Sequence, residues 1–67
     1  MIVFDKLWVT MKAKGVSTYT LREKYDFNTR GIRRLRTNQN TETKTLDKLC
    51  KILDCSLEDI ATYVRDE

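Results

Sequence analysis

The sequence predicts a compact all-α domain, and three observations lead to that class. The chain has 67 residues with no proline and only two glycines, and it combines 40% hydrophobic with 34% charged residues. This composition fits a small helical domain better than a sheet protein or a disordered tail. Apolar residues also recur at helical spacing along most of the chain. A chain of this length makes one domain, and we expect residues 1–67 to form it.

Three helices are expected in the first half. Phe4, Leu7, Trp8 and Met11 recur at positions i, i+3, i+4 and i+7, which predicts an amphipathic helix from about residue 4 to residue 14. Gly15 ends that helix.

A short second helix and a third helix follow across a tight turn. Ser17 is a suitable N-cap for the second, over residues 18–25, which would bury Leu21 and Tyr25. Asp26 and Phe27 form the turn. Asn28 then caps a third helix over residues 29–36, which points Ile32 and Leu35 inward.

Two further helices are expected after the polar loop of residues 37–43. Leu46, Leu49, Cys50 and Leu53 repeat the helical spacing, with Thr43 or Thr45 as the cap and an end near Asp54. Ser56 and Asp59 resemble a capping box at the start of a fifth helix. Its apolar stripe would consist of Leu57, Ile60, Ala61 and Val64.

Positive charge is concentrated in the first half of the chain. Residues 1–36 hold nine Lys and Arg against three Asp and Glu, whereas residues 37–67 hold four against seven. Such a basic region is the electrostatic footprint expected for a phosphate-rich partner, although a solvated face gives similar counts.

The third predicted helix carries the densest part of this charge. At 100° per residue, Arg30, Arg33 and Arg34 lie opposite Ile32 and Leu35. A solvated helix face is the simple interpretation. The helix has no acidic residue for i,i+4 pairing, however, and arginine forks suit both guanine edges and phosphate, which favours contact with DNA.

The stretch STYTLREKYDFNTRGIRRLR resembles the helix-turn-helix of the Cro/cI-type, lambda-repressor-like or Xre family of transcriptional regulators. TLDKLCKILDCSLEDI resembles the fourth helix of that family and the start of its fifth. The resemblance implies a five-helix DNA-binding domain whose helix-turn-helix is formed by the second and third helices. It also places Asp26 where the family usually has glycine, in a left-handed turn position.

The resemblance further implies a sequence-specific regulator, expected to be a repressor, that inserts residues 29–36 into the major groove of double-stranded DNA. The family's base-reading positions fall on Thr29, Arg30, Gly31 and Arg34. Its phosphate-contacting positions fall on Thr18 and on the segment from Asn38 to Lys44, with Arg33 and Arg36 adding backbone contacts. We therefore expect phosphate contacts from Thr18, Arg33, Arg36, Asn38, Thr43 and Lys44.

Gly31 is an unusual residue for a helix interior, because glycine costs about 1 kcal/mol there relative to alanine. Two hypotheses explain it. The missing side chain lets the helix N-terminus approach DNA closely, or it leaves room for Arg22.

Other functional classes have little support. The chain has no histidine and only two cysteines, so no enzyme, metal site or cofactor is expected. In a continuous helix the Cα atoms of Cys50 and Cys55 would lie about 8 Å apart, too far for a disulfide, and both are interpreted as small buried groups. Without a signal or membrane-spanning pattern, we expect a cytoplasmic protein that contacts no membrane.

Two questions stay open. Ile2, Val3, Tyr63 and Val64 exceed what one small core needs, so they either form a homodimer interface or close the monomer core. The alternative function is a protein-binding module on the same scaffold, of antirepressor or antitoxin type, because fold does not settle function.

Overall fold

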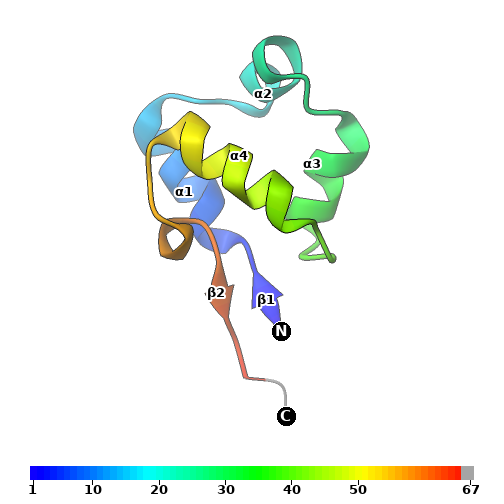
Figure 1. Cartoon of the computed structure of the whole chain (residues 1–67), viewed down its shortest axis with the longest axis vertical. Coiled ribbons are helices and arrows are strands. Elements are labelled where there is room, and N and C mark those ends of the chain that lie inside the picture. The colour runs from blue at the N-terminus through cyan, green and yellow to red at the C-terminus, as the bar shows by residue number, and fades with distance from the viewer. Residues whose placement is uncertain (66–67) are drawn as a thin grey trace.

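The computed structural model describes residues 1–65, and helices make up most of it (Figure 1). The order of elements is β1 (Ile2–Val3), α1 (Asp5–Lys14), α2 (Thr18–Tyr25), α3 (Thr29–Arg36), α4 (Thr43–Leu53), a single 3₁₀ turn η1 (Leu57–Asp59) and β2 (Thr62–Tyr63). No helix within this described range is long and apolar enough to cross a membrane.

Local signals set most of the helix boundaries. Gly15 takes a left-handed conformation with φ of 71° and ends α1. The Ser17 hydroxyl accepts a hydrogen bond from the Thr20 amide at the start of α2, and Asn28 does the same for the Gly31 amide at the start of α3. These three predicted boundaries are confirmed. At α4 the N-cap is Glu42, whose side chain makes no capping bond, so the predicted capping by Thr43 or Thr45 is wrong.

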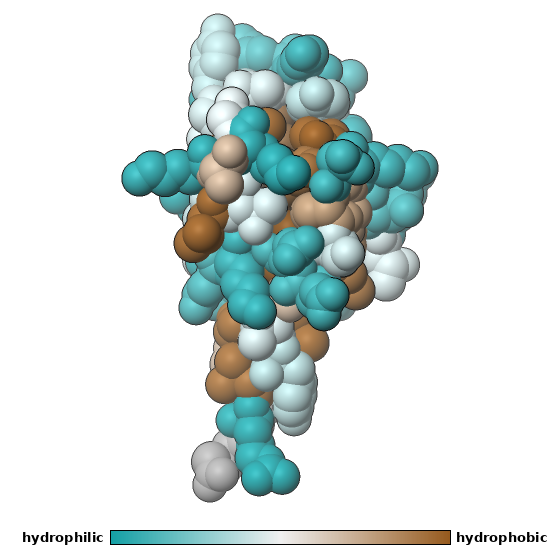
Figure 2. Space-filling view, turned by 90° about the vertical axis from the view of Figure 1, so that its left-hand side faces the viewer, coloured by the Kyte–Doolittle hydropathy of each residue, from teal (hydrophilic) through white to brown (hydrophobic). Residues whose placement is uncertain are grey.

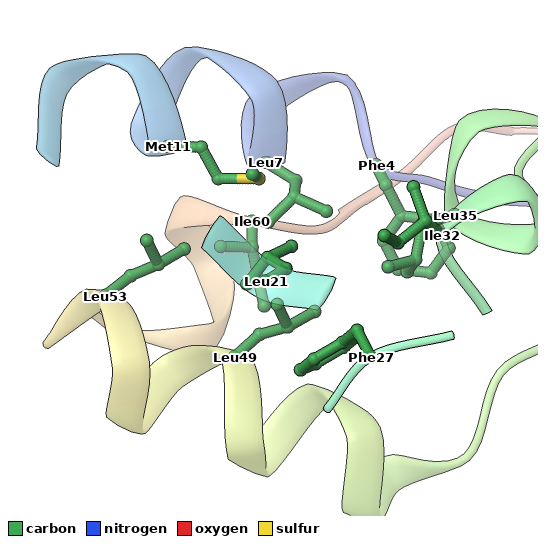
Figure 3. Packing of buried hydrophobic residues seen from close by; sticks show 10 residues of the cluster. All are labelled: Phe4, Leu7, Met11, Leu21, Phe27, Ile32, Leu35, Leu49, Leu53 and Ile60. Atoms are coloured by element: carbon green, nitrogen blue, oxygen red, sulfur yellow. The ribbon is translucent and has the colours of Figure 1, made fainter. Parts of the chain in front are cut away.

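The core gathers one or two apolar side chains from each of the four helices, together with Phe4, Phe27 and Ile60 from the segments beside them (Figure 3). Leu7 and Met11 of α1 face Leu49 and Leu53 of α4 across Leu21 of α2. Phe4, Ile32 and Leu35 form the part of the core beneath α3. The buried set is Phe4, Leu7, Met11, Leu21, Phe27, Ile32, Leu35, Leu49, Leu53 and Ile60.

The predicted fifth helix is replaced by one 3₁₀ turn and a strand. The expected capping box between Ser56 and Asp59 is present, but helical structure ends at Asp59. The Thr10 hydroxyl donates to the Asp59 carbonyl at 2.7 Å and ties this turn to α1. Of the expected apolar stripe only Ile60 is buried, and Leu57 and Val64 are exposed. The prediction of a fifth helix is therefore wrong, whereas the predicted compact and mostly helical domain is confirmed: residues 1–65 form four α-helices and a small sheet.

The sheet joins two segments that are distant in sequence. β1 and β2 are antiparallel, with Ile2 opposite Tyr63 and Val3 opposite Thr62. One residue further out, the Val64 amide donates to the Met1 carbonyl at 2.7 Å, and the Met1 amine donates to the Val64 carbonyl at 2.6 Å. Threonine, tyrosine and valine favour strands, so this non-local pairing draws residues 62–64 away from a helical path.

Candidate nucleic-acid interface

The turn between α2 and α3 has the geometry that the sequence predicts. Asp26 adopts a left-handed conformation with φ of 59°, which ends α2. The Phe27 amide donates to the Leu21 carbonyl at 3.0 Å, and the Phe27 ring is buried. Asn28 then caps α3 with its side-chain oxygen 2.6 Å from the Gly31 nitrogen. Turn, buried ring and cap together fix where α3 begins relative to α2.

The exposed face of α3 is dominated by guanidinium groups. Ile32 and Leu35 point into the core, as predicted. Among residues 1–65, no carboxylate lies within ion-pair distance of the α3 arginines. The exposed residues of the helix are Thr29, Arg30, Arg33, Arg34 and Arg36. Unpaired arginines on a short, well-capped helix present positive charge and hydrogen-bond donors to the solvent.

Gly31 lies close to the cap of its own helix. A Cβ added there would meet the Asn28 Oδ1 at 3.1 Å, which is tighter than an ordinary contact. Outside the helix backbone and the adjoining residues, no other described atom lies within 4 Å of that position. The hypothesis that Gly31 leaves room for Arg22 is therefore wrong. The close-approach hypothesis stays a prediction.

The segment after α3 is anchored through Asn38. This residue is left-handed, with φ of 55°, and its side-chain oxygen accepts a hydrogen bond from the Phe4 amide at 2.8 Å. The Gln39 amide donates to the Arg34 carbonyl at 2.8 Å, which closes the end of the helix. The carbonyl side of the Asn38 amide thus has a structural role that the sequence did not indicate. Its NH₂ group is the part that remains for another partner.

A shallow groove of about 260 Å³ runs between α3 and the start of α4. Arg30 and Arg34 border it on the α3 side, and Thr45 and Lys48 border it on the α4 side. The first-turn residues Thr43 and Lys44 are exposed, and the Glu42 side chain caps none of the α4 amides. Uncapped amides at a helix N-terminus favour an anion.

Comparison with known proteins decides the family. The model of the Cro/C1-type HTH DNA-binding domain matches residues 6–66. The chain belongs to the Cro/C1-type helix-turn-helix DNA-binding domain family. It is also similar in structure to a crystal structure of the transcriptional regulator VanUg (Form II), with a TM-score of 0.86 and 23% identity over 97% of this chain and 87% of that one. No curated protein sequence matches this chain.

Within this Cro/C1-type domain, Arg36 differs from the other α3 arginines. Its guanidinium lies over the half-buried ring of Trp8, 5.0 Å from the ring centre. A cation above an indole face is an attractive contact, which here links the end of α3 to α1. Thr18, the first residue of α2, is half-buried beside Ser17. Arg36 and Thr18, two of the six residues expected to contact phosphate, therefore lie at helix ends near Trp8 of α1.

One residue that borders the groove of this Cro/C1-type domain was not predicted from the sequence. Lys48 lies on α4, and its ammonium donates to the Tyr25 carbonyl at 2.6 Å. The same ammonium lies 4.8 Å from the centre of the Phe27 ring. Neither contact follows from spacing, because the partners are more than twenty residues away in sequence.

The two cysteines lie on either side of the α4 C-terminus. Asp54 is left-handed, with φ of 51°, and the Cys55 amide donates to the Cys50 carbonyl at 3.1 Å. The predicted end of this helix near Asp54 is confirmed, so the spacing of a continuous helix does not apply to the two cysteines. Both thiols are free and half-buried. Burial, followed by the neighbouring Cys50 and Asp59, raises the pKa of the Cys55 thiol, so this thiol is protonated at neutral pH.

Proposed function

We propose that this protein is a sequence-specific double-stranded DNA-binding transcriptional regulator that inserts α3 into the major groove. The observation that carries the proposal is the exposed face of α3, whose arginines have no acidic partner among residues 1–65. Arg30 and Arg34 read base edges, preferably guanine, whose N7 and O6 match a guanidinium fork. Thr29 contacts a base or a thymine methyl group, and Gly31 allows the backbone to come close.

The surrounding residues hold the phosphate backbone in this proposal. Arg33 and Lys44 are exposed cations, and Thr18 and Thr43 lie at helix N-termini, where the partial positive charge favours phosphate. Two further contacts, from Asn38 and Arg36, come from groups with a structural partner. Asn38 donates a hydrogen bond to phosphate through its NH₂ group, because its oxygen is bonded to the Phe4 amide. Arg36 donates to phosphate through its guanidinium while it stays over the Trp8 ring.

The regulator acts as a repressor in the cytoplasm. Occupation of a promoter by a small domain is sufficient to block transcription, whereas activation needs a second surface for the transcription machinery. Among residues 1–65 the densest run of cations in the sequence is the four arginines of α3.

The protein binds DNA as a homodimer. The two strands form a stem away from α2, and hydrophobic side chains gather on that stem (Figure 2). Ile2, Tyr63 and Val64 are exposed there, beside a shallow groove that Leu57 and Ala61 also line. Val3 is half-buried between them. Two copies joined at this surface would present two recognition helices to half-sites of one operator.

The proposal is tested by selecting binding sites from random duplexes. A defined enriched motif is expected, with two-fold symmetry if the protein binds as a dimer. On that motif, Arg30→Ala is expected to cost about 1–3 kcal/mol at one base position. Arg33→Ala is expected to weaken all sequences alike and to lower the salt slope by about one unit.

Three outcomes contradict parts of this proposal. Equal losses from both substitutions on selected and random duplexes would remove the assignment of base-reading and phosphate-contacting roles. If a monomer binds the selected motif, the proposal that the protein binds DNA as a homodimer is contradicted. No enrichment, together with tight and weakly salt-dependent capture of a protein, would favour the protein-binding module.

A further inference from the structure

The geometry points to Lys48 as a positioning residue, which holds the end of α2 and the turn in place and thereby sets the approach of α3 to DNA. This inference rests on the proposed function. It adds a residue of α4 to the machinery of sequence recognition without giving that residue a contact with DNA.

The contacts of Lys48 converge on the turn. Its ammonium donates a hydrogen bond of 2.6 Å to the carbonyl of Tyr25, the last residue of α2. It also lies over the buried ring of Phe27, 4.8 Å from the ring centre. Lys48 precedes Leu49, whose side chain is fully buried, so the backbone that carries it is fixed by the core.

Each contact stabilises the turn for a separate physical reason. The last carbonyls of a helix have no partner within the helix, so a donor at Tyr25 satisfies one of them. The helix dipole places partial negative charge at the same end, which a cation offsets. The Phe27 ring adds a cation–π contact. The left-handed Asp26 lies between these two contacts, so Lys48 bridges the least regular part of the chain between α2 and α3.

The effect reaches α3 through one covalent step. Phe27 is followed directly by Asn28, whose side chain caps α3 through the Gly31 amide. Arg30 and Arg34 border the same groove as Lys48 and are carried by the helix that Asn28 starts. A turn that loosens therefore changes the angle at which both arginines meet base edges.

The obvious competing role for Lys48 is a direct contact with phosphate. Lys48 and Lys44, one helical turn earlier, are both exposed. The Lys48 ammonium is engaged by a carbonyl and a ring, whereas Lys44 has no such contacts among residues 1–65. The two roles predict different salt dependence. A phosphate contact contributes to counterion release and hence to the slope of log K against log salt, and a positioning residue does not.

The test compares four variants of the full chain. Lys48→Met keeps the apolar stem and removes the charge, and Lys48→Arg keeps the charge. Lys44→Met provides the signature of a phosphate contact. Lys51→Met removes an exposed α4 cation whose ion pair among residues 1–65 is with Asp47, at 3.2 Å, and it serves as the matched charge control. Affinities for a selected duplex and a random duplex are measured from low to high salt.

Lys48→Met is expected to reduce the ratio of selected to random affinity roughly tenfold, in line with the loss of a charged hydrogen bond, without changing the salt slope on random DNA. Lys48→Arg is expected to restore the ratio. If Lys48→Met lowers the salt slope by about one unit and weakens binding to both duplexes equally, the inference is overturned. It is also overturned if Lys48→Met leaves the ratio of selected to random affinity unchanged.

A second measurement uses the free protein and does not depend on DNA binding. The Asp26 and Phe27 amides both donate to Leu21, and amide hydrogen exchange reports on those bonds. Lys48→Met is expected to speed their exchange at least threefold more than that of α1 amides, and Lys51→Met is expected to leave the ratio unchanged. Uniform acceleration throughout the domain would show only general destabilisation and would overturn the inference. If no duplex is bound, the proposed function fails, and this exchange pattern still decides the role of Lys48.

Discussion

The stability of Gly31→Ala tests how closely the Asn28 side chain, the cap of α3, packs against residue 31. In an unconstrained helix interior, alanine is about 1 kcal/mol more favourable than glycine. Here the new methyl group would lie 3.1 Å from the Asn28 Oδ1, so that oxygen must retreat by a few tenths of an ångström. The same oxygen accepts the 2.6 Å bond from the Gly31 amide.

The magnitude follows from two opposing terms. A side-chain N-cap contributes about 1 kcal/mol, and displacement of Asn28 forfeits a large part of it. The gain in helix propensity and the weakened cap then nearly cancel. We expect Gly31→Ala to change the free energy of unfolding by less than about 0.5 kcal/mol.

A double-mutant cycle separates these terms. Asn28→Ala removes the oxygen that the methyl group would meet, at a cost of about 1 kcal/mol. In that background Gly31→Ala is expected to deliver its full gain of about 1 kcal/mol, so the coupling between the two sites is about 0.5–1.5 kcal/mol. Urea unfolding at constant m-value measures all four free energies.

One result would refute the reasoning. If Gly31→Ala stabilises the natural sequence by the full amount and the cycle shows no coupling, the cap does not constrain residue 31. The affinity of Gly31→Ala for a selected duplex tests the role of the glycine in DNA binding. A loss of affinity without a change in stability would support close approach of the helix to DNA, and an unchanged affinity would mean that the glycine is not needed for binding.

Two further predictions concern the end of α4. Asp54 is left-handed, and Asp54→Gly is expected to stabilise the protein by up to about 1 kcal/mol because glycine adopts this conformation without strain; an unchanged urea midpoint would contradict this. The raised pKa of Cys55 means that the unfolded thiol ionises before the folded one. Stability from this group is therefore complete below the ordinary thiol value of 9.0 and declines above it, so the free energy of unfolding should fall more steeply with alkaline pH in the natural protein than in Cys55→Ala, and equal slopes would contradict it.

The sequence predicted those features that depend on neighbouring residues. Gly15, Ser17 and Asn28 mark helix ends through their own conformational and hydrogen-bonding preferences, so the boundaries of α2 and α3 agree with the predicted ranges. The arginine face follows from the period of the helix alone. Family membership is confirmed by the match over residues 6–66, whereas the individual DNA contacts stay predictions.

The features that the sequence missed depend on distant partners. Residues 57–64 have helical spacing, but pairing with residues 1–3 gives part of this segment a strand. The Asn38 side chain bonds to Phe4, 34 positions away, and Lys48 bonds to Tyr25, 23 positions away. Such contacts leave no periodic signal. The short runs at Ile2–Val3 and Thr62–Val64 are the one hint, because both are rich in β-branched and aromatic residues.

The pairing of β1 with β2 makes the order of synthesis matter for this domain. Ile2 leaves the ribosome well before its partner Tyr63, which is sixty-one positions later, so the strand pair can close only when the residues between them have emerged. The entropic cost of closing a loop grows only slowly with its length, so the long separation of the two strands adds little to the free-energy cost of pairing them. The end of α4 at Leu53 precedes Thr62 by only nine residues, so the strand pair can form soon after the last helix is available, and it completes the folded domain.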